Sequence, residues 1–79
     1  MSRITAFVRL EESIVLGGVA LVAGQYEVAY GNDSVLGVFI DILDEDESTV
    51  FARDSRFDRL THAQLKTLLK RLGITPQKI

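Results

Sequence analysis

Five acidic residues gather near the middle of the chain, where their carboxylates could bind a hard cation or act as general acid and base. They are Asp41, Asp44, Glu45, Asp46 and Glu47. A calcium loop of the EF-hand type spreads its acidic residues at alternate positions around a glycine turn, whereas this stretch is short and has no glycine. Acid–base catalysis needs two carboxyl groups in a cleft that separates their pKa values, and no nucleophile adjoins these acids. We therefore expect a solvated hairpin tip, no metal and no cofactor.

Other residue types that carry catalysis are scarce. The sequence has no cysteine and one histidine, His62, which excludes Cys–His and His–His ligand sets. His62 falls in the first turn of a predicted helix, where an exposed, solvated side chain is expected. Gly17-Gly18 and Gly24 lack the Lys-Ser/Thr pair that follows a phosphate-binding loop. These glycines instead indicate turns and close packing. Because no combination of residues typical of catalysis is present in the sequence, we expect no enzymatic activity.

Basic residues concentrate in the last third of the chain and form a candidate partner-binding segment, residues 53–71. They are Arg53, Arg56, Arg59, Lys66, Lys70 and Arg71. Such a segment could contact phosphates, and the nearby Phe51 and Phe57 could stack on bases if they are exposed. The net charge of −2 argues against a nucleic-acid domain. The alternative is an ordinary polar helix face with a loop in which Asp54 and Asp58 pair locally with the arginines.

Two tyrosines form a second candidate surface. Tyr26 and Tyr30 share one face of a predicted strand, and Phe39 could join them across a hairpin. An exposed aromatic row would bind a protein partner, because tyrosine supplies contact area with little loss of entropy. A row that faces inward would instead belong to the core.

Alternating apolar residues predict strands along the first two thirds of the chain. Ile4 to Leu10 alternates with a period of two, which is typical of a strand with one buried face. Residues 25–30 and 35–42 flank a cluster of turn-forming residues and predict a β-hairpin. Residues 49–53 predict one more strand. The short links favour an antiparallel meander over about residues 3–53.

An N-terminal cap, an apolar face and a C-terminal cap together predict a helix over about residues 61–72. Thr61 and Gln64 fit a capping box. Leu65, Leu68, Leu69 and Leu72 recur at the spacing of one apolar helix face. Gly73 is the expected residue after the helix, and Ile74 can pack back on the last turn, as in a Schellman cap.

These elements predict an α+β fold in which a small antiparallel β-meander is packed against one C-terminal amphipathic helix. We expect a single domain over residues 1–79, with a loop at 54–60 and a short tail at 73–79. The five-stranded sheet is expected either to close into a small SH3-like barrel or, as the second alternative, to stay open with the helix on one face.

Composition and charge indicate an interaction protein. Hydrophobic residues make up 47% of the chain, which favours either a dense core or a surface covered by a partner. Residues 1–50 hold nine acidic and two basic residues, whereas residues 51–79 hold two acidic and seven basic ones. We expect no signal peptide, no membrane segment and a cytoplasmic location. The predicted function is a non-catalytic protein–protein interaction module, a homo-oligomer that acts as an adaptor, inhibitor or assembly subunit. The alternative is a nucleic-acid-binding regulator that uses residues 53–71.

Overall fold

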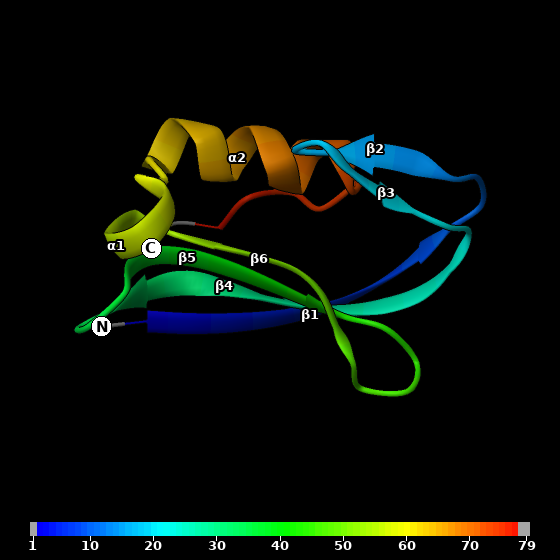
Figure 1. The fold of residues 1–79 in the computed structure, drawn as a ribbon, viewed down its shortest axis with the longest axis horizontal. Helices are drawn as coiled ribbons and strands as arrows, with labels where there is room; N and C mark the ends of the chain where they lie inside the picture. Colours follow the sequence, from blue (N-terminus) through cyan, green and yellow to red (C-terminus); the bar gives the residue numbers. More distant parts are fainter. Residues whose placement is uncertain (1, 78–79) are drawn as a thin grey trace.

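A four-stranded antiparallel sheet forms one layer of the molecule, and a helix and a small β-hairpin form the other (Figure 1). The computed structural model describes residues 2–77. In chain order its elements are β1 (Ser2–Leu10), β2 (Ile14–Leu16), β3 (Val19–Leu21), β4 (Gly24–Asp33), β5 (Gly37–Leu43), β6 (Thr49–Asp54), α1 (Ser55–Asp58) and α2 (His62–Arg71). The α+β class predicted from the sequence is confirmed.

The strand order of the main sheet is β1-β4-β5-β6. The hairpin predicted over residues 25–30 and 35–42 is present as β4 and β5, which pair from Glu27–Leu43 to Asp33–Gly37. Its turn comes later than predicted, because residues 31–33 continue β4 and residues 34–36 form the turn. β1 does not pair with the next strand along the chain. It pairs over its whole length with β4, from Ser2–Asn32 to Leu10–Gly24, while β2 and β3 form a separate two-stranded hairpin.

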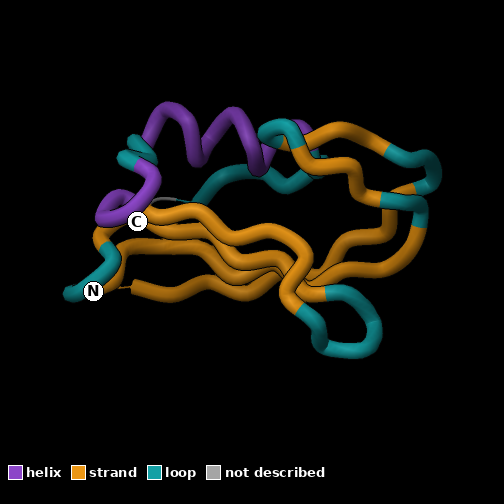
Figure 2. The backbone as a smooth tube through the Cα atoms, in the orientation of Figure 1, coloured by secondary structure: helices purple, strands orange, loops and turns teal. Residues whose placement is uncertain are grey.

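The expected barrel is wrong, because the sheet is open. β1 and β6 are its two ends, and they do not pair with one another among the described residues. β6 leads directly into α1 and α2, which turn back over the sheet, and the β2–β3 hairpin covers the same face beside α2 (Figure 2). The apolar face that a barrel would enclose is therefore covered by these two elements. The second alternative, an open sheet with the helix on one face, describes the fold.

The core lies between the sheet and this covering layer. The sheet contributes alternate residues that face α2, among them Val28, Tyr30, Ile40 and Ile42, each fully or almost fully buried. Since directly paired residues point to the same side of a sheet, the register places this set on one side, called here the inner face. The hairpin adds the buried side chains of Leu16 and Leu21, and α2 adds leucines of its apolar stripe.

The predicted end signals of α2 are confirmed. The Thr61 hydroxyl accepts the backbone N–H of Gln64 at 3.1 Å, and the Gln64 side chain accepts the backbone N–H of Thr61 at 3.0 Å. At the other end Gly73 adopts a φ of 79°, and the N–H of Ile74 donates to the carbonyl of Leu69 at 2.9 Å. This bond is the defining one of a Schellman cap.

The segment predicted as a loop at residues 54–60 contains the short helix α1. The Asp54 side chain caps it by accepting the backbone N–H of Phe57 at 2.7 Å. Arg59 ends the helix in the left-handed conformation, with a φ of 55°. One helical turn is too short to produce the apolar periodicity that reveals a helix in a sequence.

Candidate interaction surfaces

Tyr26 and Tyr30 belong to the core. Both lie on the inner face of β4 and are almost fully buried, and the Tyr26 hydroxyl donates to the carbonyl of Val22 at 2.7 Å. Phe39 is also buried, but it lies on the opposite side of the sheet, because its neighbour Ile40 points inward. The three aromatic side chains therefore do not form one row, and the two tyrosines offer little surface to a partner.

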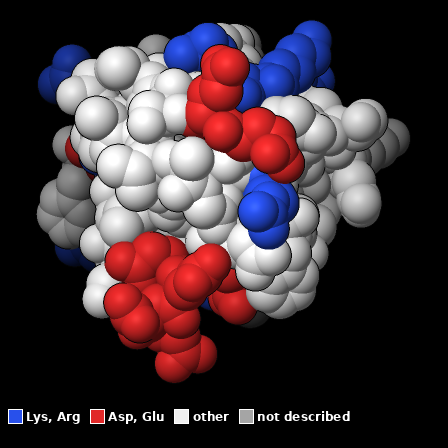
Figure 3. Space-filling view, turned by 90° about the vertical axis from the view of Figure 1, so that its right-hand side faces the viewer, with Lys and Arg blue, Asp and Glu red and all other residues white. Residues whose placement is uncertain are grey.

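The acidic stretch forms the turn between β5 and β6, as expected. Asp44 organises it, since its Oδ1 accepts the backbone N–H groups of Asp46 at 2.9 Å and of Ser48 at 3.0 Å. Figure 3 shows acidic side chains in a cluster at the lower edge of the face that contains this turn. Within residues 2–77 no group of three or more acidic, histidine or cysteine side chains is arranged to hold a metal ion.

Two residues of the basic segment are engaged within the chain. Arg53 donates from Nη1 to the carbonyl of Ala52 at 2.7 Å and from Nη2 to that of Gly17 at 3.4 Å. Arg71 donates to the carbonyl of Val15 at 2.9 Å. Both arginines therefore attach the β2–β3 hairpin to the rest of the molecule, one from β6 and the other from α2.

The remaining basic residues lie on the surface in two groups. Arg56 is on α1, where its guanidinium carbon lies 5.1 Å from the ring centroid of Phe57, and Arg59 follows. Lys66 and Lys70 are four residues apart and share an exposed face of α2. The six basic residues expected to act together are thus divided among the hairpin attachment, α1 and α2.

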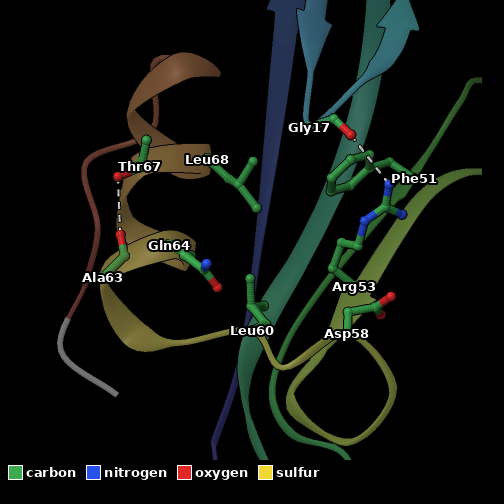
Figure 4. Close-up of a pocket in the computed structure, with 9 residues that line it drawn as sticks. All are labelled: Gly17, Phe51, Arg53, Asp58, Leu60, Ala63, Gln64, Thr67 and Leu68. Carbon is green, nitrogen blue, oxygen red and sulfur yellow. Dashed lines mark hydrogen bonds between the residues drawn. The ribbon is translucent and has the colours of Figure 1, made fainter.

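A groove between α2 and β6, called here the helix groove, is a feature that sequence reasoning missed. It has a volume of about 530 Å³. Its lining residues are Gly17, Phe51, Arg53, Asp58, Leu60, Ala63, Gln64, Thr67 and Leu68. Figure 4 shows Leu60, Gln64 and Leu68 on one side, facing Phe51 and Arg53 on the other. Gly17 comes from the distant β2–β3 turn and the other eight residues from positions 51–68, which run through β6, α1 and α2, so no motif within a single element could have revealed the groove.

The β6 side of the helix groove carries an aromatic ring, a cation and a carboxylate. The guanidinium carbon of Arg53 lies 4.4 Å from the centroid of the Phe51 ring, which is a cation–π distance. The hairpin tip touches the same ring, since a Cβ on Gly17 would lie 3.1 Å from it. Asp58 accepts the backbone N–H of Asp54 at 3.0 Å and makes no ion pair with Arg53 within residues 2–77.

The sheet face opposite the core, called here the outer face, has no helix or strand packed on it in the part of the chain that the structure describes (Figure 1). Its most exposed large apolar side chain is Phe7 on β1, which is 77% exposed. Phe7 lies directly opposite Glu27 of β4. β1 is also an edge strand, so its second row of backbone groups has no strand partner among residues 2–77.

Two carboxyl groups near the outer face have shifted pKa values. Partial burial raises the pKa of Asp41 above its usual value; the nearby Arg3 opposes this shift, and Asp54 adds to it. Backbone hydrogen bonds from Leu36 and Val35 lower the pKa of Asp33. Asp33 accepts both N–H groups on Oδ2, at 2.9 and 2.8 Å, and so organises the β4–β5 turn.

Comparison of this chain with protein-family models, with curated proteins and with solved structures finds no match. Neither helix described between residues 2 and 77 is long and apolar enough to span a membrane.

Proposed function

We propose that this chain is a non-catalytic protein–protein interaction module that self-associates by antiparallel pairing of β1 with β1 of a second copy. The observation that carries the proposal is the difference between the two sheet edges. β1 has nine residues, is regular along its length and contains no proline. Such an edge offers a row of free N–H and C=O groups to another strand.

The β6 edge has features that oppose such pairing. β6 has six residues, its pairing with β5 shifts register between Ile42 and Leu43, and α1 begins directly after it. Bulges and short strands are common means of blocking edge-to-edge association. β1 carries neither, so the proposal places the second copy there.

Charge selects among the ways in which two β1 strands can pair. A pairing centred on Ala6 would place Arg3 opposite Arg9 of the other copy twice, and like charges directly opposite one another destabilise a sheet. A pairing centred on Phe7 avoids this clash. It places the two Phe7 rings opposite one another and brings Arg3 towards Glu11 of the other copy. We favour this second pairing, which joins two four-stranded sheets into one.

The test compares the oligomeric state of two lysine variants by sedimentation velocity and native mass spectrometry. Phe7→Lys places one lysine on each side of the dimer axis, where the two cations repel one another. Within a single copy the new lysine lies opposite Glu27, so the folded monomer should tolerate it. Phe57→Lys is the matched control, because Phe57 is 71% exposed but lies on α1. We expect a dimer for the natural chain and for Phe57→Lys, and a monomer for Phe7→Lys. A monomeric natural chain, or equal behaviour of the two variants, would overturn the proposal.

Nucleic-acid binding by the basic segment is the second candidate. The observation that favours it is the guanidinium of Arg56 beside the exposed ring of Phe57, since such pairs stack on bases. Retention of the natural chain on single-stranded DNA or RNA, lost in an Arg56→Ala, Arg59→Ala double variant, would support it. Unchanged retention, or none in either protein, would exclude this site. A cytoplasmic location remains a prediction from the sequence.

A further inference from the structure

We infer that the helix groove is a second, separate binding site, which takes a partner peptide that carries an apolar side chain next to an acidic residue. The groove lies on the inner-face side of the sheet, away from the outer face and between α2 and β6. The inference therefore does not rest on self-association through β1.

The apolar part of the site is formed by the one leucine of the helix stripe that the fold leaves partly uncovered. Leu65, Leu69 and Leu72 are buried, whereas Leu68 is half-buried and lines the groove together with Leu60 and Ala63. A side chain of leucine or isoleucine size placed among them would remove apolar surface from water on both partners, which is favourable in proportion to the area buried.

The acidic part of the ligand is inferred from the burial of Arg53 and from its unused hydrogen-bond donors. This side chain is half-buried, and two of its five N–H groups donate to the Ala52 and Gly17 carbonyls. The Phe51 ring occupies one face of the guanidinium. A ligand that covers the groove removes water from the remaining donors, so it must supply an acceptor in its place. An ionised acceptor bonds a guanidinium about twice as strongly as a neutral one, and a carboxylate is the ionised acceptor that unmodified peptide side chains carry.

The other polar residues of the groove favour a peptide as the occupant. Gln64 and Thr67 stand on exposed turns of α2 along the groove, and both can bond to a peptide backbone. Gln64 shares its side-chain oxygen with the helix cap but keeps its amide N–H₂ for donation. Asp58, on the side of Arg53, adds a negative charge. Its repulsion disfavours a peptide with acidic residues on both sides of the apolar one.

The experiment is an NMR titration of the ¹⁵N-labelled full chain with two blocked peptides, Ser-Gly-Leu-Glu-Gly-Ser and its counterpart with Gln in place of Glu. We expect saturable shifts of the backbone amides of Gly17, Ala63, Gln64, Thr67 and Leu68. We expect the Glu peptide to bind about tenfold more tightly, since hydrogen bonds to charged groups contribute that much or more. Free N-acetyl-leucine, which has the same leucine and a carboxylate, should bind more weakly than the Glu peptide.

Two variants connect the preference to the groove. Arg53→Gln should remove the preference for Glu over Gln, while Arg56→Gln, on the neighbouring helix α1, should keep it. Because Arg53 also holds the hairpin, Thr67→Glu is a second variant on the exposed face of α2; its carboxylate should weaken binding of the Glu peptide more than that of the Gln peptide. Absence of shifts at the groove, equal affinity for both peptides, or N-acetyl-leucine binding as tightly as the Glu peptide would overturn the inference. A monomeric natural chain would leave it standing, which keeps its failure distinct from that of the proposed function.

Discussion

Arg3 of β1 and Phe39 of β5 meet across Gly31 of β4: the guanidinium carbon lies 5.5 Å from the ring centroid, although their strands do not pair with each other. Gly31 is the direct partner of both residues in the register. Because glycine has no side chain, the arginine and the aromatic ring can approach one another above it. This contact contributes to the burial of Phe39 on a sheet face on which no other helix or strand of residues 2–77 packs.

Gly31→Ala should lower the free energy of unfolding more than Gly24→Ala does. Both glycines are in β4 with a φ of 153°, so the backbone strain of the substitution is shared. A Cβ at Gly31 would collide with the carbonyl oxygen of Ser2, whereas at Gly24 it would meet nothing within 4 Å. Overpacking of this kind costs about 1–3 kcal/mol. Urea unfolding followed by circular dichroism measures the difference, and equal losses would contradict the close approach of β1 to β4.

Leu69→Ala should destabilise the fold by about 2–5 kcal/mol, which is the usual loss for a buried leucine. Leu68→Ala is the matched control one position earlier, and its loss should be clearly smaller, because Leu68 is half-buried and borders the helix groove. Both substitutions place alanine in the same helix, so helix propensity affects them alike. The midpoints of urea unfolding for the two variants compare them directly. A larger loss for Leu68→Ala would contradict the structure, because it would mean that Leu68 is the more deeply packed of the two leucines.

Thr61→Ala should cost about 1 kcal/mol of stability, the typical effect of losing an N-cap. Its hydroxyl accepts the backbone N–H of Gln64, which has no other partner in the first turn of α2. Thr67→Ala is the control within the same helix. Its hydroxyl donates to the carbonyl of Ala63 at 3.1 Å, and removal of such a mid-helix threonine should leave stability unchanged or raise it. Thermal unfolding midpoints of the two variants are compared: a lower midpoint for Thr61→Ala alone supports its role as the helix cap, and equal midpoints would contradict it.

Asp33→Asn should destabilise the protein at neutral pH and matter less in acid. Backbone hydrogen bonds from Leu36 and Val35 lower the pKa of Asp33 below its usual value of 3.8, so the carboxylate binds fewer protons when folded than when unfolded. Stability from this group is then complete above about pH 4 and is lost as the pH falls through the folded pKa. The gap in unfolding free energy between the natural chain and the variant, measured from pH 7 to pH 2.5, should narrow below that point. A gap independent of pH would show that the amide bonds to the turn as well as the carboxylate does.

Local signals explain what could be predicted from the sequence. The ends of α2 are set by bonds between residues three to five positions apart, such as Thr61–Gln64 and Ile74–Leu69, and these positions can be read directly from the chain. The β4–β5 hairpin likewise depends on a turn that Asp33 organises through residues two and three positions ahead. The helix forms where expected, and the hairpin pairs the two predicted segments although its turn lies at residues 34–36, because the sequence signals and structural causes of both elements lie close together in the chain.

The errors arise where the cause is distant. Alternation in β1 predicts a strand, but the partner of that strand depends on whether the β2–β3 segment pairs with itself or joins the sheet. The barrel prediction failed at this point. Two interpretations of Tyr26 and Tyr30 stayed open for the same reason: their spacing is identical for an inward and an outward row, and only the position of α2 decides between them. The helix groove joins Gly17 to Leu68, a pairing that no local pattern contains.

The separate β2–β3 hairpin also bears on the order in which the chain folds. β4, β5, β6 and the helices follow one another with short connections, so their contacts close small loops and can form early. β1 must wait, because Ser2 finds its partner only at Asn32, with the whole hairpin between them. We therefore expect β1 to dock last and, in the native protein, to detach first, leaving β4 as a temporary edge. A chain that exchanges its β1 with a neighbour during this interval would keep every native contact, so refolding at high concentration should favour dimers with swapped first strands.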